Sequence, residues 1–505
     1  MKVLSANQIR EADAYTIKHE PISSIDLMER AAQVCVEWLV AQFEKTFEFT
    51  VVCGPGNNGG DGLAIARLLR KAGYQTDVIL MSNSKKSTSD YEINLSRLEK
   101  MGDVRCVSIE EGSVLDLVEN GPNRVWVDAI FGSGLSRSIT GFIGQVIQEI
   151  NQSGLPIISI DIPSGLFSED NTENKGYIIN AHYTLSLQLP KLAFLFPDNG
   201  IHTGQWVVLP IGLDQTFIGE QETPYNYVTK SLVQGILIER EKFSHKGKYG
   251  HALLIAGSDG MMGAAVLAAK SCLRSGAGLL TTWVPGCGYE IMQGAVPEAM
   301  AVSDAENDHI SGGHKVVKYN AIGVGPGMGM HEDTVKMLKH LIQDTSVPMV
   351  FDADAINIIA ENKTWLSFIP KGSIYTPHPG EFKRLVGDHG AGFERLSKQI
   401  EFSIKYGVYV VLKGMHTSIT LPDGSCYFNS TGNAGMATGG SGDVLTGIIT
   451  GLIAQGYPKG LACVLGVYLH GLAGDIACSK LGMESMISGD IVSCLGDAFQ
   501  QLIRA

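Results

Sequence analysis

The sequence lacks the cysteine patterns of a disulfide scaffold or a zinc module. Its nine cysteines are odd in number, scattered along the chain and never spaced as Cys-x-x-Cys. Disulfide frameworks and cysteine-bound zinc require regular, paired spacings. We therefore expect reduced thiols that lie mostly in the core, a cytoplasmic location and no zinc site.

Basic charge is also scarce. The chain has 39 Lys and Arg residues against 52 Asp and Glu residues, which gives a formal net charge of -13. Nucleic acids and anionic membranes are bound by basic surfaces. We therefore expect no nucleic-acid partner and no membrane partner, and any phosphorylated ligand must be held by a local site.

Long uninterrupted hydrophobic runs are missing as well. The most apolar late segment, residues 461–478, is interrupted by His470 and Asp475, so we expect a buried helix and no membrane span. Residues 1–11 include polar and charged positions and contain no apolar signal-peptide core. The Gly-x-x-x-x-Gly-Lys-Ser/Thr phosphate loop is absent too, so a nucleotide must be bound by another architecture.

What the chain does contain is 505 residues with 60 glycines and 44% hydrophobic residues, a composition that suits an α/β protein with many tight junctions. At roughly 150 residues per domain, two to four domains are expected. Short β-rich runs alternate with helical ones, which predicts an open, mostly parallel sheet flanked by helices in each half. The expected strands cover residues 49–53, 76–80, 124–129, 156–160, 183–187, 205–209, 252–255, 321–324, 347–352 and 408–412, and the expected helices include residues 24–43, 63–72 and 444–452.

The boundary between the halves is expected near residue 225. Residues 216–227 lack clear periodicity and contain Pro224, as is typical of a linker. We find no sequence repeat between the halves. The sequence therefore predicts two separate domains, residues 1–224 and 225–505.

The chain is organised around a glycine-rich stretch from Asn433 to Gly447, followed by an apolar run that begins a helix. Its glycines leave the backbone free to approach a ligand closely, and the exposed N–H groups and dipole of the helix start favour a phosphate. Asp443 lies at the edge of this anion hole. A carboxylate there suits a base that takes a proton from a hydroxyl attacking phosphorus, although the same residue in a plain turn would only cap the helix.

Polar side chains also follow the strands of the first half. Asp61, Asp128 and Asp161 each come shortly after a predicted strand or close it, and the carboxyl ends of parallel strands meet in one crevice. Taken singly, each could be a cap or a turn residue. The glycines at 54, 56 and 59, with Asp77 at the end of the next strand, also match the dinucleotide-binding fingerprint. A dehydrogenase therefore remains an alternative function for this half.

Three segments of the first half resemble the signature segments of NAD(P)H-hydrate epimerases: Asn57-Asn58-Gly59-Gly60-Asp61, Asp128-Ala129-Ile130-Phe131-Gly132-Ser133-Gly134 and Asp161-Ile162-Pro163-Ser164-Gly165. The resemblance spans roughly residues 1–213. It implies a Rossmann-like three-layer domain that interconverts the R and S hydrates of NADH and NADPH (NADHX and NADPHX).

The resemblance also implies site residues. Asp161 would be the acid/base, and Asn58, Asp128 and Ser164 would bind K⁺, which prefers such oxygen ligands. The substrate contacts that it implies are Asn57, Asn58, Gly59, Gly60, Asp61, Gly132, Ser133, Gly134, Leu135, Ser136, Arg137, Ser138 and Asp161.

The second half resembles the ribokinase-like superfamily, whose late glycine-rich loop ends in a catalytic Asp, and within it the ADP-dependent NAD(P)H-hydrate dehydratases. The resemblance covers roughly residues 232–505 and rests on residues 257–265, 325–329, 352–357, 378–381 and 432–445. It implies that Asp443 activates the hydroxyl of the hydrated ring for phosphorylation by ADP. The phosphorylated hydrate then loses phosphate, so that the products are NADH or NADPH, AMP and phosphate.

The implied binding residues of this half fall into two groups. Ala264, Gly327, His378 and Asp443 would contact the hydrate, and Lys413, Gly414, Met415, His416, Thr417 and Gly442 would contact the nucleotide. Mg²⁺ is implied as well, with Glu381 helping to place it through water. The two halves together are similar to the bifunctional NAD(P)H-hydrate repair family, and we also expect a homo-oligomer.

Two rival hypotheses remain at this stage. The chain could be a ribokinase-like kinase for a vitamin precursor or sugar, fused to a dinucleotide-binding domain, and would then leave a stable phosphorylated product. It could also be a non-catalytic nucleotide-binding or scaffold protein. The asparagine pair and three strand-end carboxylates argue against a passive module, because burying acids without a chemical role is costly.

Overall fold

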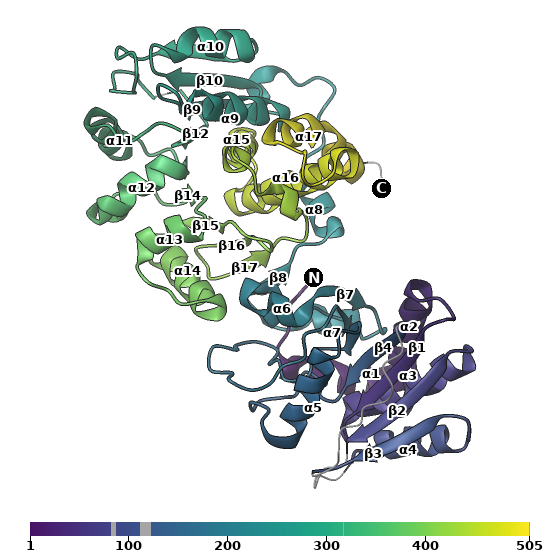
Figure 1. The fold of residues 1–505 in the computed structure, drawn as a ribbon. Coiled ribbons are helices and arrows are strands. Elements are labelled where there is room, and N and C mark those ends of the chain that lie inside the picture. Colours follow the sequence, from purple (N-terminus) through teal and green to yellow (C-terminus); the bar gives the residue numbers. More distant parts are fainter. Residues whose placement is uncertain (82–86, 112–122, 317, 504–505) are drawn as a thin grey trace. The chain divides into compact units, whose positions relative to one another are not determined.

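The structure is a computed structural model, and it describes residues 1–81, 87–111, 123–316 and 318–503. The chain divides into two compact units (Figure 1). The N-terminal unit comprises residues 2–223 and 391–393, and the C-terminal unit comprises Met1 and residues 224–390 and 394–505.

The N-terminal unit is built on a seven-stranded sheet in the order β3-β2-β1-β4-β5-β6-β7, and all six strand pairs are parallel. The strands are β1 (Glu48–Cys53), β2 (Gln75–Met81), β3 (Arg105–Ile109), β4 (Arg124–Ala129), β5 (Ile157–Ile160), β6 (Tyr183–Leu187) and β7 (Gln205–Leu209). The strand order reverses between β1 and β4. At such a switch point the crossover connections run to opposite faces and leave a crevice outside the strand ends.

Helices cover both faces of this sheet and give it three layers (Figure 1). The helices of this part of the chain are α1 (Ala6–His19), α2 (Ser24–Gln42), α3 (Asn57–Lys71), α4 (Ser89–Glu99), α5 (Gly141–Gln152), α6 (Gly200–Thr203) and α7 (Gln215–Glu220). On one face, Leu39 of α2 and Leu63 of α3 pack with Val51 of β1. On the other face, Ile147 of α5 packs with Trp126 of β4. The central strands β1 and β4 are therefore buried, as is typical of parallel sheets covered on both faces.

The C-terminal unit is built on a ten-stranded sheet in the order β11-β10-β9-β12-β13-β14-β15-β16-β17-β8. Only β16 is antiparallel to its neighbours. The strands are β8 (Tyr225–Tyr227), β9 (His251–Ile255), β10 (Leu279–Val284), β11 (Met300–Ser303), β12 (Ala321–Val324), β13 (Met349–Phe351), β14 (Ile374–Tyr375), β15 (Tyr409–Leu412), β16 (Ser418–Thr420) and β17 (Cys426–Phe428). This sheet reverses its order between β9 and β12.

Two hydrophobic clusters fill the two faces of the larger sheet. One packs α9, α15, α16 and α17 against it, and the other packs α11, α12 and α13. The helices are α8 (Lys230–Ile236), α9 (Met262–Arg274), α10 (Gly288–Ala295), α11 (Glu332–Asp344), α12 (Ala353–Glu361), α13 (Pro379–Val386), α14 (Gly392–Tyr406), α15 (Ser441–Ala454), α16 (Lys459–Leu481) and α17 (Ser488–Ile503). Short 3-10 helices lie at Leu192–Leu195, Pro197–Asn199, Lys246–Tyr249, Lys363–Ser367 and Ala434–Met436.

The α/β prediction is confirmed in both halves, but three local predictions are wrong. The helix expected from Leu63 begins six residues earlier, at Asn57. Residues 216–227, expected to be a plain linker, contain α7 and β8, because β8 pairs with β17 across 200 residues of chain. Asp77 lies near the start of β2, where its carboxylate is 2.9 Å from Arg124 Nη1, so it is an ion-pair residue and does not face the strand ends.

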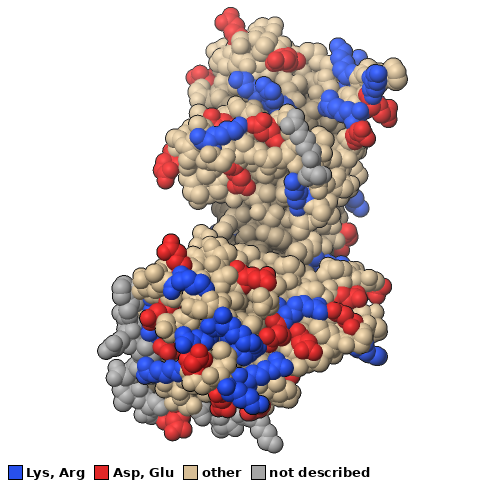
Figure 2. All heavy atoms as spheres, turned by 90° about the vertical axis from the view of Figure 1, so that its right-hand side faces the viewer, with Lys and Arg blue, Asp and Glu red and all other residues tan. Residues whose placement is uncertain are grey.

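The segment expected to be a buried apolar helix is α16. By length and composition this helix could cross a membrane, but 72% of its most apolar stretch is buried inside the protein. The two polar residues that interrupt its apolar sequence both form hydrogen bonds within the protein. His470 Nε2 lies 3.2 Å from Ser441 Oγ, and Asp475 accepts hydrogen bonds from the Gly432 N–H and from Asn433 Nδ2. This is the behaviour of a core helix. On the face drawn in Figure 2, basic side chains are interspersed with acidic ones.

Candidate functional sites

A cavity of about 750 Å³ opens at the switch point of the N-terminal sheet. The start of α3 contributes Asn57, Asn58 and Asp61 to its wall. The loop after β4 contributes residues 132–137, and Asp161 follows β5. The structure thus brings together most of the residues expected to contact the hydrate, because they all lie at the carboxyl ends of neighbouring parallel strands.

Three of the expected contact residues do not line this cavity. Gly59 and Gly60 are buried within α3, and Ser138 Oγ lies 3.0 Å from Asn174 Oδ1. Gly59 has a backbone role: a Cβ built there would lie 1.7 Å from the carbonyl oxygen of Gly54. Only glycine lets the helix start this close to the end of β1, and this places the two asparagines at the cavity wall.

Asp161 is held in place by a buried cation. Its backbone has φ of +66°, a conformation that non-glycine residues adopt rarely and that concentrates at functional sites. One of its carboxylate oxygens forms an ion pair with Lys191, whose side chain is fully buried. The Lys191 ammonium also bonds Ser186 Oγ and the carbonyl oxygens of Leu187 and Leu189. These partners fix the ammonium and, through it, the carboxylate.

Two further carboxylic acids share this environment. Asp13 of α1 lines the cavity. Burial, and after it the charge of Asp161, raises the pKa of Asp13 to about 7. Burial is also the largest cause of the raised pKa of Asp61, followed by the charges of Asp161 and Asp13. The cavity therefore combines one lysine-paired carboxylate with two acids that hold their protons at higher pH, an arrangement suited to proton transfer.

The three expected K⁺ ligands cluster beside this cavity, around the backbone of Phe131. Asn58 Nδ2 donates to the carbonyl oxygen of Phe131 at 3.0 Å, and the Phe131 N–H donates to Ser164 Oγ at 2.9 Å. Ser164 Oγ in turn donates to Asp128 Oδ1 at 2.5 Å. Burial raises the pKa of Asp128, so a nearby cation would favour its charged form. The oxygen-rich donor set and the buried carboxylate both fit a hard cation.

The second candidate site forms at the start of α15, in the C-terminal unit. Gly440 precedes the helix with φ of +90°. A Cβ built on Gly442 would lie 3.1 Å from Lys413 Nζ and 3.6 Å from Asp352 Oδ2. The Lys413 ammonium therefore lies directly against the first turn of α15, where helix dipole and cation both favour a phosphate.

Asp443 occupies the same first turn. Burial, and after it the charge of Asp352, raises the pKa of Asp443 to about 7, while the Lys413 cation opposes the rise. A carboxylate with this pKa is well matched to general-base work near neutral pH. Lys413 Nζ lies 2.9 Å from Asp352 Oδ1, and Thr446 Oγ1 donates to Asp352 Oδ2 at 2.7 Å. Asp352 is 1% exposed, so this lysine-aspartate pair is a fixed part of the site.

His378 is connected to Lys413 through Glu381. It is the N-cap of α13, and its Nδ1 accepts the N–H groups of Gly380 and Glu381. Glu381 Oε2 accepts the His378 N–H at 2.8 Å and lies 3.9 Å from Lys413 Nζ. His378 is thus a capping residue, and the buried Glu381 links its position to that of Lys413.

The remaining predicted residues of this half lie in two places, a pair of neighbouring residues and a turn. A Cβ built on Gly327 would lie 3.0 Å from that of Ala264, so these two expected substrate contacts are neighbours. Residues 413–417 form the turn between β15 and β16, closed by the Gly414 N–H donating to Thr417 Oγ1 at 3.2 Å. In this turn Met415 is 77% exposed and His416 Nδ1 contacts the carbonyl oxygen of Asn429.

Sequence reasoning missed Asp13, Lys191 and Asp352 as site residues. Asp352 is the last residue of the strand predicted at 347–352 and begins the segment 352–357, which carries part of the family resemblance, so its position carried a signal. Asp13 and Lys191 have no comparable sequence signal. Asp13 lies on the N-terminal helix α1, and Lys191 lies in an irregular segment before η1 (Leu192–Leu195). Their contacts with the Asp161 site arise only from the tertiary fold.

The fold and these two sites define an α/β protein with a candidate site in each unit, one of which combines a helix start and a lysine, which favour phosphate, with a neighbouring carboxylate. Two family descriptions match the chain: "YjeF-related protein N-terminus" over residues 24–193 and "NAD(P)H-hydrate dehydratase" over residues 252–495. The bifunctional NAD(P)H-hydrate repair enzyme of Moorella thermoacetica is 36% identical over 98% of this chain and 96% of its own length. That of Escherichia coli K12 is 31% identical over 97% and 92%.

Solved structures resemble the C-terminal unit. A ribokinase-like superfamily protein from Enterococcus faecalis V583 is 27% identical, with a TM-score of 0.50, over 56% of this chain and 98% of its own. A Bacillus subtilis protein described as an ADP/ATP-dependent NAD(P)H-hydrate dehydratase, crystallised with ATP and Mg²⁺, is 32% identical over 55% and 98%, with a TM-score of 0.49. The chain belongs to the family of bifunctional NAD(P)H-hydrate repair enzymes, which combine an epimerase with a dehydratase.

Proposed function

We propose that residues 1–224 epimerise the hydrates of NADH and NADPH and that residues 225–505 dehydrate the S form with ADP as phosphoryl donor. The observation that carries the second assignment is the meeting of Lys413, Asp352 and Gly442 at the start of α15, with Asp443 in the same turn. The first assignment is supported by the carboxylate-lined cavity at the N-terminal switch point.

For dehydration, Asp443 takes the proton of the ring hydroxyl as its oxygen attacks the terminal phosphorus of ADP. Lys413 and the backbone N–H groups at the start of α15 bind the phosphates and stabilise the charge that moves onto the leaving AMP. The phosphorylated ring then expels inorganic phosphate from one carbon and a proton from the adjacent carbon, which restores the ring double bond. The turn at residues 413–417 would hold the rest of the nucleotide, and Ala264, Gly327 and His378 would hold the hydrate.

Mg²⁺ would neutralise phosphate charge when bound. Lowering the repulsion at the phosphorus is the chemistry it supplies. Three acidic residues, Asp352, Glu381 and Asp443, act electrostatically on Lys413. Because one lysine cannot balance three carboxylates, these residues fit a bound divalent cation. We propose that Glu381 orients the Mg²⁺ ion through a water molecule. One Glu381 oxygen already accepts the backbone N–H of His378, which leaves the other oxygen for such a water.

For epimerisation, the ring hydroxyl must leave as water and return on the opposite face. We assign the two proton transfers to Asp161 and Asp13: the protonated Asp13 donates to the departing hydroxyl, and the ionised Asp161 accepts a proton from the returning water. The lysine-held charge of Asp161 and the raised pKa of Asp13 support this division. Asn57, Asn58 and Arg137 would orient the nucleotide, and K⁺ held by Asn58, Asp128 and Ser164 would fix the loop after β4.

We further propose a reducing, cytoplasmic location, which the nine free cysteines support. Association into a homo-oligomer stays a prediction. NADHX, NADPHX and ADP are the proposed small-molecule partners.

The test is the absorbance of reduced nicotinamide during incubation of an R and S mixture of NADHX with the full chain, Mg²⁺, K⁺ and either ADP or ATP. Full recovery of NADH with equimolar nucleotide consumption is expected. Recovery of only half of the hydrate would remove the epimerase assignment. No recovery with either nucleotide, together with phosphorylation of a small hydroxyl compound, would replace the dehydratase assignment with a kinase.

A further inference from the structure

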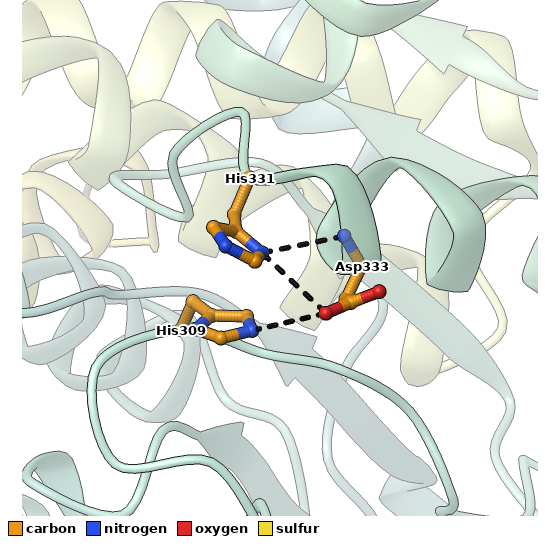
Figure 3. A group of neighbouring side chains, drawn as sticks. All are labelled: His309, His331 and Asp333. Carbon is orange, nitrogen blue, oxygen red and sulfur yellow. Dashed lines mark hydrogen bonds and ion pairs between the residues drawn. The ribbon is translucent and has the colours of Figure 1, made fainter.

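Two histidines and a carboxylate meet in the C-terminal unit, outside both candidate sites. His309 lies between β11 and β12, His331 immediately precedes α11, and Asp333 is in the first turn of that helix. Asp333 Oδ2 is 3.8 Å from His309 Nε2 and 3.7 Å from His331 Nδ1. Figure 3 shows both ring nitrogens turned toward this oxygen.

These separations suit ligands that share one small cation. They are too long for hydrogen bonds. Metal bonds of about 2.1 Å in tetrahedral geometry place two ligand atoms about 3.4 Å apart, so a shift of a few tenths of an ångström would bring Asp333 Oδ2 to that separation from each histidine nitrogen. One ligand atom from each of the three residues lies within 4.8 Å of the others. The imidazole centroids are 3.8 Å apart, a stacking contact that keeps the two rings side by side.

His309 is oriented as metal-binding histidines are. Its Nδ1 is 2.7 Å from Asp308 Oδ1, which favours the tautomer with the proton on Nδ1 and leaves the Nε2 lone pair for a metal. The residue is 9% exposed, and among the described residues its buried Nε2 has no hydrogen-bond partner. A lone pair facing the Asp333 carboxylate is repelled by it, and a cation between them would turn that repulsion into attraction.

The other two residues keep a ligand atom available. Lys336 Nζ bonds Asp333 Oδ1 at 2.8 Å, which leaves Oδ2 for the metal. His331 Nδ1 accepts the backbone N–H of Asp333 at the long distance of 3.3 Å, a weak cap that a metal bond can replace. The side chains of His331 and Asp333 are 52% and 43% exposed, so an ion and its water can enter from solvent.

We propose that His309 Nε2, His331 Nδ1 and Asp333 Oδ2 bind a divalent transition metal of the zinc class, with water completing the coordination. Two imidazoles and one carboxylate select such a metal over Mg²⁺, which prefers oxygen ligands alone. The site uses no cysteine, which is why the expectation of no zinc, based on cysteine spacing, did not anticipate it. The bound metal would join the β11–β12 connection to the start of α11.

The experiment is a zinc titration of the full-length chain, stripped of metal with EDTA, in competition with a chromogenic zinc indicator. The main variant is His331→Asn, because asparagine is a good N-cap and preserves the start of α11. The matched control is His340→Asn, which removes an exposed histidine from the same helix. The wild type and the control should bind one equivalent of zinc, and His331→Asn should weaken binding at least about tenfold.

His331→Asn also separates this site from a neighbouring group, because only the proposed site uses His331. Glu306, Asp308 and His309 also lie close enough to hold an ion. Asp308→Asn should weaken zinc binding about 10-fold to 100-fold, as loss of a supporting carboxylate does, while His331→Asn weakens it further. Equal zinc affinity in His331→Asn and His340→Asn, or no stoichiometric zinc binding by the wild type, would overturn the proposal.

Discussion

At the residue scale, Asp13 tests whether the epimerase uses a pair of acids. Asp13→Asn removes the acid but keeps its size, so epimerisation should slow about 100-fold, within the range of general acid catalysis. The measurement is the rate at which pure R hydrate becomes a substrate for the dehydratase. Dehydration of the S hydrate by the same variant is the internal control and should be unchanged. An unchanged epimerisation rate would leave Asp161 as the sole acid/base.

The pH dependence of dehydration follows from Asp443. Only the ionised carboxylate accepts a proton, and its pKa is raised to about 7, so kcat/KM for the S hydrate should fall below about pH 7 and level off above it. Because the Lys413 cation holds this pKa down, Lys413→Gln should move the falling limb to higher pH as well as weaken nucleotide binding. A pH profile that stays flat down to pH 5 would rule out Asp443 as the base.

The site residues differ in whether a short sequence pattern reveals them or only the tertiary fold does. Asn57, Asn58, Asp61 and Asp443 could be picked out from sequence as candidates, because glycine-rich turns and helix starts are short-range patterns, although Gly59 and Gly60 from the same segment do not line the cavity. Lys191 could not, since its role depends on a buried ion pair across 30 residues with an aspartate that has positive φ. Asp352 was visible as a polar residue after a strand, but its hydrogen bond with Thr446 spans 94 residues. Such pairings are set by the tertiary fold.

At the scale of elements, the first turn of α15 depends on having no side chain at residue 442. A Cβ at Gly442 would lie 3.1 Å from Lys413 Nζ, so Gly442→Ala should push the ammonium away from the phosphate position. We expect the KM for ADP to rise about tenfold, equivalent to about 1.4 kcal/mol of lost binding. The matched control is Gly439→Ala, where a Cβ meets nothing within 4 Å. Equal KM values in the two variants would contradict this role of Gly442.

Several strands were predicted with the correct bounds, whereas elements that depend on partners were not. The bounds of β4 and β12 agree with their sequence patterns, because β-branched and apolar runs between turns are typical of buried strands, and β6 and β7 agree as well although their patterns are weaker. By contrast, β8 is only three residues long, and it exists because β17 pairs with it. The start of α3 at Asn57 was missed because glycines and asparagines have low helix propensity; here tertiary packing outweighs it.

At the scale of the whole molecule, the two units share a design without sharing a sequence. Each places its candidate site at the carboxyl ends of parallel strands, and the N-terminal cavity lies at the point where the sheet order reverses. Each also pairs a lysine with an aspartate: the fully buried Lys191 with Asp161, and the partly buried Lys413 with the buried Asp352. In the first pair the aspartate is the proposed acid/base, whereas in the second it fixes the lysine beside the proposed base, Asp443. We therefore propose that the same placement at strand ends serves two different chemistries.

If the two sites act separately on a hydrate that diffuses between them, two inactive chains should complement each other. Asp161→Asn should lose epimerisation and keep dehydration, and Asp443→Asn should do the reverse, each by about 1,000-fold. With an R and S mixture and ADP, the first variant alone should recover only the S half as NADH, apart from spontaneous epimerisation, and the second should recover none. An equimolar mixture of the two full-length variants should recover both halves. Loss of both activities in either folded variant, or failure of the mixture, would show that the sites must act together in one chain.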